Sequence, residues 1–334
     1  MITKDSFSIL ISKYSLVYKI AIALFVALLI FGIIGYAILT PTLSTFVKEL
    51  KTLNLDDTIK EYLLSIFKGV ADNDLPSDEV TNPQNPGMTQ EYQNLVQGMR
   101  DALAIFKQNL GAIWGGIVAI IILIILFAIF YYICLYTVTD IMNAFMSSDS
   151  EYGFTSNLVA NLSRSIRFAL AYVGLSLVIL AFIFALSLGL GFLFSAWNNL
   201  IGIIISYFTL LVLLSVKRAL FAGWMPTYVV SDMTLKESLV ANFKIAQKYF
   251  KDSLGMYLML YLFALILAAV VGVLTLGIGF MIVVSMCTVF AQAFDLVNYY
   301  HYSGKKYYKD VQHVVDPTKK YKDAVLDNPL DNSL

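Results

Sequence analysis

Between Leu254 and Phe294 the chain runs for 41 residues without a charged side chain, interrupted only by the short sequence Thr275-Leu276-Gly277. At about 1.5 Å of rise per helical residue, this length suffices for two membrane crossings joined by a tight turn. A soluble domain would leave so large an apolar surface with nothing to cover it. The stretch therefore predicts a protein of the lipid bilayer.

The composition agrees with a membrane protein. Hydrophobic residues make up 59% of the chain and charged residues 14%, against about 25% charged residues in ordinary soluble domains. The 23 basic and 23 acidic side chains cancel, so the charge does not indicate nucleic acid as a partner. Cys134 and Cys287 both lie in apolar segments, and His301 and His313 are too few and too far apart for a metal site. We therefore expect no disulfide framework, no metal and no cofactor.

Six apolar runs are long enough to cross a bilayer, which needs roughly 20 helical residues. The predicted spans are Ile20–Leu39, Ala112–Tyr136, Phe168–Ala196, Leu200–Val216, Leu254–Leu274 and Leu276–Phe294. The first exceeds the ~7–15 apolar residues of a signal peptide, so we expect it to be retained. The fourth is expected to end at Lys217-Arg218, because two cations at the bilayer centre would cost at least ~5 kcal/mol. The segment after it, 219–230, is expected to lie along the interface.

The basic residues predict the orientation of the spans. Seventeen of the 23 Lys and Arg residues fall on the same side as both termini, and the two short turns opposite, 197–199 and the one at Thr275, hold none. Under the positive-inside rule both termini are cytoplasmic, and we expect a multi-pass protein of the cell membrane. Aromatic residues fit two interfacial belts. They are Trp114 and Trp197 outside, and Tyr14, Tyr18, Tyr131, Tyr132, Tyr299 and Tyr300 inside.

The spans divide the chain into four regions. Residues 1–40 hold an N-terminal interfacial helix and the first span, residues 111–302 the bundle of the other five spans, and residues 303–334 a Lys-rich cytoplasmic tail. Residues 41–110 form an extracytoplasmic loop. Its apolar residues recur at helical spacing within 43–50, 55–70 and 92–110, which predicts three short amphipathic helices. Proline and carboxylates gather between them and predict a disordered linker at 71–88.

A five-residue sequence occurs twice on the cytoplasmic side. Leu158-Val159-Ala160-Asn161-Leu162 recurs 81 positions later as Leu239-Val240-Ala241-Asn242-Phe243. Each copy precedes an outward-going span. A chance match of common apolar residues is the alternative, but the matching location favours a duplication. We expect three parallel helical-hairpin repeats, each with a cytoplasmic interfacial helix, an outward span and a return span.

The second copy lies in a basic amphipathic helix. Thr234 and Glu237 form a capping box, in which each side chain satisfies a free backbone N–H of the other residue. Apolar residues of 235–250 share one face of the helix. Four lysines lie off that face: Lys236, Lys244, Lys248 and Lys251. We expect these lysines to contact membrane lipids of the anionic inner leaflet.

Polar residues near the cytoplasmic ends of the return spans are the main candidates for function. They are Asp140, Lys217, Arg218, Gln292 and Asp295. Ionisable groups at membrane depth commonly mark a substrate or ion pathway, so these residues predict a gate or a substrate-contact cluster across the helices. The alternative is that they only end the spans and face lipid headgroups.

Signatures of catalysis were sought in the same segments. Paired carboxylates, Ser/His/Asp sets and metal-spaced His, Asp or Glu do not occur at membrane depth, where the polar groups are mainly Ser, Thr, Tyr and Gly. We therefore expect a non-enzymatic protein without catalytic residues.

The segment from Trp224 to Tyr300 resembles a known membrane domain. It has Pro226, then YVVSDMTLKESLVANFKIAQKYF, a span, the turn TLGIGF and a last span that ends in a tyrosine pair. It resembles the membrane domain fused to some glycerophosphodiester phosphodiesterases, and related stand-alone six-helix bacterial membrane proteins of unknown activity. The sequence departs from that pattern by lacking a phosphodiesterase domain and by carrying the loop 41–110. The resemblance implies a fold more than a chemistry.

Two functions fit these observations. The first is a transporter or permease-like subunit for an amphipathic substrate, a lipid or a peptide. Because no nucleotide-binding motif is present, transport would need a partner ATPase or an ion gradient, and 235–250 would be the docking site. The second is a membrane scaffold or stress/immunity factor that recruits an extracytoplasmic or cytoplasmic protein through the outer loop or the tail.

Overall fold

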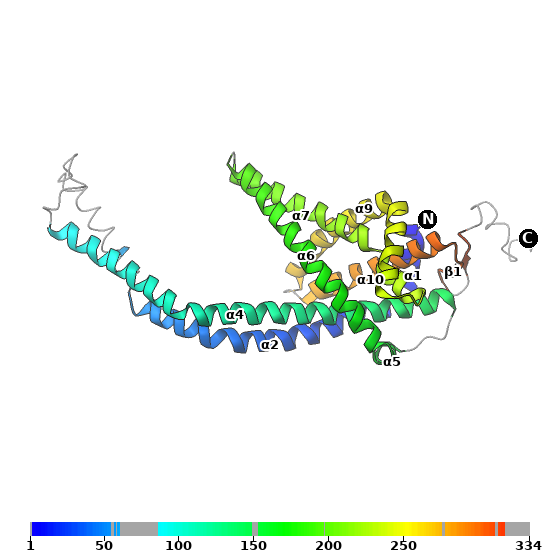
Figure 1. Ribbon diagram of the computed structural model, residues 1–334, viewed down its shortest axis with the longest axis horizontal. Helices are drawn as coiled ribbons and strands as arrows, with labels where there is room; N and C mark the ends of the chain where they lie inside the picture. Colours follow the sequence, from blue (N-terminus) through cyan, green and yellow to red (C-terminus); the bar gives the residue numbers. More distant parts are fainter. Residues whose placement is uncertain are drawn as a thin grey trace, which may run out of the picture. The chain divides into compact units, whose positions relative to one another are not determined.

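The computed structural model describes residues 2–54, 57, 59–60, 86–148, 153–196, 198–275, 278–310 and 313–317. Nearly all of them are helical (Figure 1). The helices are α1 (Ile2–Ser12), α2 (Ser15–Lys51), α4 (Pro86–Ser147), α5 (Phe154–Ala160), α6 (Leu162–Ser195), α7 (Asn199–Phe221), α8 (Trp224–Val230), α9 (Leu235–Leu274) and α10 (Ile278–Ser303). Strands β1 (Tyr307–Tyr308) and β2 (Val314–Val315) pair antiparallel.

Among the described residues, six helices are long and apolar enough to cross a membrane. They are α2, α4, α6, the segment Asn199–Val230, α9 and α10, so the predicted number of spans is confirmed. The helices extend beyond the predicted apolar cores, and α2 does so through Pro41. Trp197 and the predicted turn residues Leu276 and Gly277 lie outside the described residues.

The chain forms two compact units, one of Met1–Leu28 with Leu126–Leu334 and the other of Leu29–Ile125. In the second unit the end of α2 packs on the start of α4. Asn109 Nδ2 donates to Glu49 Oε2 at 2.6 Å, and a Cβ on Gly35 would lie 3.3 Å from Ile120. The prediction of separate short helices at 43–50 and 92–110 was wrong. They are the ends of two long helices, since their helical periodicity continues into the spans.

The third expected outer helix, at 55–70, lies largely outside the described residues, as does most of the linker 71–88. The same holds for the tail beyond Pro317.

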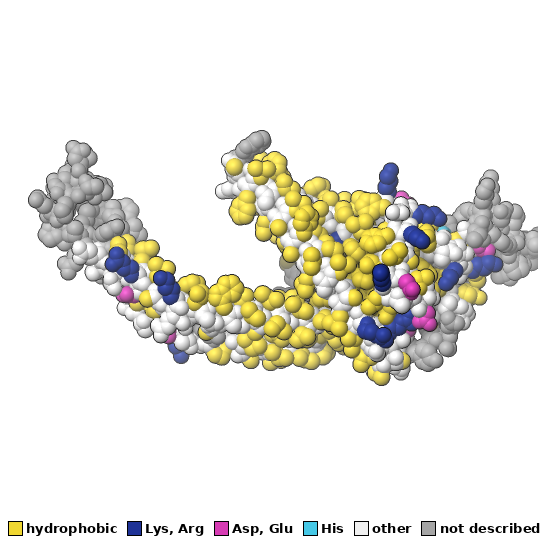
Figure 2. Space-filling model, in the orientation of Figure 1, with side chains coloured by type: hydrophobic (Ala, Val, Ile, Leu, Met, Phe, Trp, Pro, Cys, Tyr) yellow, Lys and Arg dark blue, Asp and Glu magenta, His cyan; other side chains and the backbone are white. Residues whose placement is uncertain are grey.

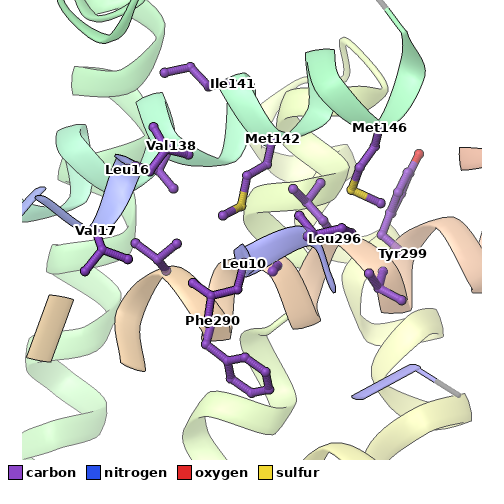
Figure 3. Close-up of a cluster of buried hydrophobic side chains, with 14 of the residues drawn as sticks. Leu10, Leu16, Val17, Val138, Ile141, Met142, Met146, Phe290, Leu296 and Tyr299 are labelled. Carbon is purple, nitrogen blue, oxygen red and sulfur yellow. The ribbon is translucent and has the colours of Figure 1, made fainter. Parts of the chain in front are cut away.

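Helix α10 is the centre of the first unit. In its most apolar window 67% of the residues are buried, against 6–17% in the other five spans. Its largest cluster of buried side chains joins α1, the start of α2, the end of α4 and α10 (Figure 3). Leu10, Met142, Phe290 and Leu296 all belong to this cluster. Because α1 buries Ile9 and Leu10 in this cluster, one face of the expected interfacial helix packs on protein.

Helix α8, which was expected along the membrane interface, is buried against other helices. All of Trp224–Val229 is buried, and the aromatic side chains pack on α4 and α6, with Phe168 centred 5.3 Å from Trp224 and 5.5 Å from Tyr228. The expectation of an interfacial position considered only polarity and did not foresee this packing on protein; the depth of α8 in a membrane stays a prediction. Gly223 makes the close approach to α9 possible, since a Cβ there would lie 3.0 Å from Asn242 Oδ1.

Helix α9 combines two elements that were expected to be separate. The capping box of Thr234 and Glu237 is present, as predicted. From there one helix runs through 235–250 into the span Leu254–Leu274 without a break. No proline or other breaker separates the two parts, so the basic segment is the first part of α9 and no independent interfacial helix forms.

The hairpin of α6 and α7 depends on small residues. Ser187 Oγ donates to the carbonyl of Ser206 at 2.5 Å, and a Cβ on Gly202 would lie 2.6 Å from the carbonyl oxygen of Gly191. The two backbones thus approach too closely for a larger side chain. Figure 2 shows hydrophobic side chains along this hairpin and charged side chains gathered nearer α9 and the C-terminal strands.

The two ends of the described chain are joined by hydrogen bonds. Tyr307 Oη donates to Asp5 Oδ2 at 2.8 Å and lies 2.9 Å from His301 Nε2. Burial, together with the nearby Asp5 carboxylate, raises the pKa of Tyr307. This phenol therefore remains a hydrogen-bond donor that ties β1 to α1.

Candidate ligand-binding site

A cavity of about 330 Å³ lies in the first unit between α4, α6, α7, α9 and α10. Its polar lining consists of five tyrosines, two cations, a threonine and a glutamine. These are Tyr131, Tyr132, Tyr172, Tyr257, Tyr261, Lys217, Arg218, Thr288 and Gln292. The remaining lining is apolar or weakly polar: Leu214, Leu260, Ala264, Val284, Cys287 and Ala291. The cavity therefore combines basic groups, hydroxyl groups and an apolar wall.

A buried ion pair joins two of the helices. Arg218 Nη2 on α7 lies 2.5 Å from Asp295 Oδ2 on α10, and only 2% of the Asp295 side chain is exposed. Tyr257 on α9 donates its hydroxyl to the other carboxylate oxygen. The Arg218 guanidinium also lies 5.6 Å from the centre of the Tyr257 ring. The Tyr257 hydroxyl matters because a buried ion pair offsets its desolvation cost only when the remaining lone pairs of its carboxylate accept hydrogen bonds.

Lys217 is the next residue on α7 and has a different environment. Its ammonium group lies 5.5 Å from the centre of the Tyr172 ring, close enough for a cation–π contact. Within the described part of the chain no carboxylate pairs with it. Since Asp295 balances Arg218, Lys217 adds to the cavity a cation that no carboxylate in the described part of the chain balances.

Hydrogen bonds fix the wall that α4 and α10 share. Thr139 Oγ1 donates to Gln292 Oε1 at 3.0 Å, and the hydroxyls of Tyr131 and Thr288 lie 3.0 Å apart. Gln292 is 1% exposed, so this bond gives a partner to an amide oxygen that could not reach solvent. The wall is thereby held in one arrangement.

The structure brings together four of the five candidate residues. Lys217, Arg218 and Gln292 line the cavity, and Asp295 binds Arg218 directly behind it. Asp140 does not line it. Its Oδ2 accepts hydrogen bonds from Asn157 Nδ2 at 2.7 Å and Asn161 Nδ2 at 3.0 Å.

The helix geometry of α4 explains why Asp140 is apart. Successive residues of a helix point in directions about 100° apart, so Thr139 can face Gln292 while Asp140 faces α5. The expected cluster of all five residues is corrected to a cluster of four.

The tyrosines of the cavity were missed by sequence reasoning. Tyr131 and Tyr132 were expected in the inner aromatic belt and instead line the cavity, with Tyr132 centred 4.4 Å from Tyr172. Tyr299 and Tyr300 of the same belt are buried against protein. A usable signal was the spacing of Tyr257 and Tyr261, which places two hydroxyls on one helix face inside the charge-free stretch.

The four lysines predicted to contact lipid are all exposed on α9. The ammonium group of Lys248 lies over two rings, 5.5 Å from Tyr302 and 5.6 Å from Tyr249. Among the described residues, no three His, Cys, Asp or Glu side chains lie close enough together to hold a metal ion.

The fold defines a multi-pass helical membrane protein. Comparison with protein-family models, with curated proteins and with solved structures gives no match. The resemblance to the phosphodiesterase-linked membrane domain therefore stays a prediction.

Proposed function

We propose that this protein binds an amphipathic anion in the cavity and carries it as a transporter or permease-like subunit. The observation that supports this most is Lys217, a partly buried cation without a carboxylate partner among the described residues, beside a pair that neutralises itself. Charges at membrane depth are costly and usually serve a substrate pathway. An anionic ligand would supply the missing partner.

The remaining lining fits an amphipathic molecule. Tyrosine hydroxyls and the Arg218 fork can donate hydrogen bonds to phosphate or carboxylate oxygens. The apolar side of the cavity, with Leu214, Leu260 and Val284, offers a surface for a hydrocarbon part. The volume of about 330 Å³ lies in the range of pockets that hold small ligands.

The direction and energy of transport belong to the same proposal. We place both termini in the cytoplasm on the basis of the basic residues, and we take the cell to be bacterial on the basis of the family resemblance. The exposed lysines of α9 would contact the anionic inner leaflet or dock a partner ATPase. An ion gradient is the alternative source of energy.

The proposed duplication gains support from two asparagines. Asn161 and Asn242 occupy the same place in the repeated pentapeptide, and each donates its side-chain amide to the last part of a preceding long helix. Asn161 reaches Asp140 in α4 at 3.0 Å, and Asn242 reaches the Leu220 carbonyl in α7 at 2.8 Å. The acceptors are 80 positions apart, against 81 for the asparagines.

The test measures binding of an anionic and a zwitterionic lysolipid to purified protein. The probes are lysophosphatidylglycerol and lysophosphatidylcholine with the same acyl chain. Wild type should prefer the anionic probe, and Lys217→Gln should weaken its binding about 10-fold, as expected for a lost charged hydrogen bond of ~1.5 kcal/mol. Lys236→Gln on the exposed face of α9 is the matched control and should change little. Equal binding of both probes, unaffected by Lys217→Gln, would sink the proposal and favour the scaffold.

A further inference from the structure

A second cavity of about 250 Å³ lies between α1, α9 and α10. Every side chain that lines it is apolar or a thiol. Three methionines and three phenylalanines dominate it: Met256, Met259, Met286, Phe7, Phe263 and Phe290. Methionine is unbranched and flexible, so such a lining adapts to a flexible hydrocarbon chain.

The second cavity adjoins the charged one. Leu260 on α9 and Cys287 on α10 line both. On α9 the residues Tyr257 and Tyr261 line the charged cavity, while Met259 and Phe263 line the apolar one. Helical spacing thus divides one helix surface between a polar and an apolar cavity, with Leu260 at the boundary.

The same division occurs on α10. Thr288 and Ala291 line the charged cavity, whereas Met286 and Phe290 line the apolar one, with Cys287 between them. Figure 3 shows Leu10 of α1, which lines the apolar cavity together with Phe290. The two cavities therefore share a wall, which Leu260 and Cys287 form.

We infer that the ligand is a lipid whose anionic headgroup lies at Lys217 and Arg218 and whose acyl chain passes between Leu260 and Cys287 into the methionine-lined cavity. This rests on the proposed function and selects lipid over peptide. A peptide would bring backbone N–H and C=O groups into the second cavity, where the lining offers no strong hydrogen-bond partner. An acyl chain needs none.

The experiment compares octanoyl- and palmitoyl-lysophosphatidylglycerol on wild type, Lys217→Gln and Cys287→Phe. Wild type should bind the palmitoyl probe more tightly, because its chain reaches the second cavity. Cys287→Phe should weaken binding of the palmitoyl probe about 10-fold and change binding of the octanoyl probe little. Lys217→Gln should weaken binding of both probes by the same factor. Cys287→Ser, which keeps the size of the thiol, is the matched control and should behave as wild type.

The outcomes separate the two claims. If Lys217→Gln leaves both probes unaffected, the headgroup site is wrong and the proposed function fails with it. If Lys217→Gln weakens binding of both probes but Cys287→Phe changes their binding equally, the headgroup site stands and the acyl path is overturned.

A measurement on wild-type protein covers the case in which Cys287→Phe does not fold. A palmitoyl probe with a diazirine at its chain end should crosslink to the peptide that holds Met256, Met259 and Phe263. Crosslinks confined to the α6–α7 hairpin would overturn the inference.

Discussion

Two arginine–aspartate pairs in the first unit have the same chemistry and opposite surroundings. Arg218 and Asp295 join α7 to α10 with side chains 16% and 2% exposed. Arg164 and Asp232 join α6 to the turn after α8, with side chains 27% and 87% exposed. Water and salt screen the outer pair, so it contributes little. The inner pair stabilises the fold only as long as both partners remain.

The difference predicts which of the two pairs has a role besides stability. Replacing a buried ion pair by well-packed apolar residues is often neutral or stabilising, so stability alone does not require one at α7 and α10. The inner pair holds Arg218 against the cavity, whereas the outer one reinforces a turn.

The largest effect is expected from Asp295→Ala. It leaves the Arg218 guanidinium buried without its carboxylate, which should lower the free energy of unfolding by about 3–5 kcal/mol. Denaturant unfolding in detergent measures this. The double variant Arg218→Met with Asp295→Leu should recover most of the loss, and it should still bind the anionic lysolipid poorly. If the double variant were as unstable as Asp295→Ala, the loss of stability would not come from the unpaired charge of Arg218.

A smaller effect is expected from Tyr257→Phe. It removes the hydroxyl that donates to Asp295 and leaves one carboxylate oxygen unsatisfied, at a cost of about 1–3 kcal/mol. Thermal unfolding compares it with Tyr261→Phe, a matched change on the same face of α9, for which about half that loss or less is expected. Equal losses for the two variants would argue against a specific bond.

Arg164→Ala should lower the free energy of unfolding by less again, about 1 kcal/mol, in the same unfolding experiments. Besides Asp232, the Arg164 guanidinium donates to the Tyr228 carbonyl at 2.6 Å and lies 4.8 Å from the Tyr228 ring centre. Arg164→Lys keeps the charge and should retain only part of the stability, since Lys lacks the planar fork. If Lys restores stability fully, charge alone matters at this position.

The smallest effect is expected from Asp232→Asn, about 0.2–1 kcal/mol. Asp232 has a φ of 55°, and asparagine tolerates this left-handed conformation, so only the ion pair is lost. In high salt the double-mutant coupling of this pair should vanish, while that of the inner pair persists. Salt-insensitive coupling at Asp232 would remove the contrast between the two pairs.

Hydropathy and residue spacing predicted the parts of the fold that depend only on residues close together in the sequence. The six spans and the capping box at Thr234 follow from residue type and spacing, which act within a few helical turns. Helix ends were predicted less well. The stretch 43–50 belongs to the helix of the first span despite Pro41 between them, and 235–250 continues into its span without a proline. The polarity of a segment therefore says little about where its helix stops.

The candidate site was predicted in part for the same reason. Charges near the ends of apolar runs are visible in sequence, so Lys217, Arg218 and Asp295 stood out. The tyrosines and the burial of α8 were missed, because amphipathic aromatic rings suit both a membrane interface and a protein interior. Only neighbouring helices decide between the two.

By itself the sequence determined that the chain is a helical membrane protein with six spans, since the cost of exposing apolar residues or burying charge is set by the residues alone. The tertiary structure decided which charges meet. It paired Arg218 with Asp295 across 77 positions, turned Asp140 toward α5 and left Lys217 without a carboxylate among the described residues. The rotation and packing of each helix fix these partners, and both depend on side chains far away in the chain.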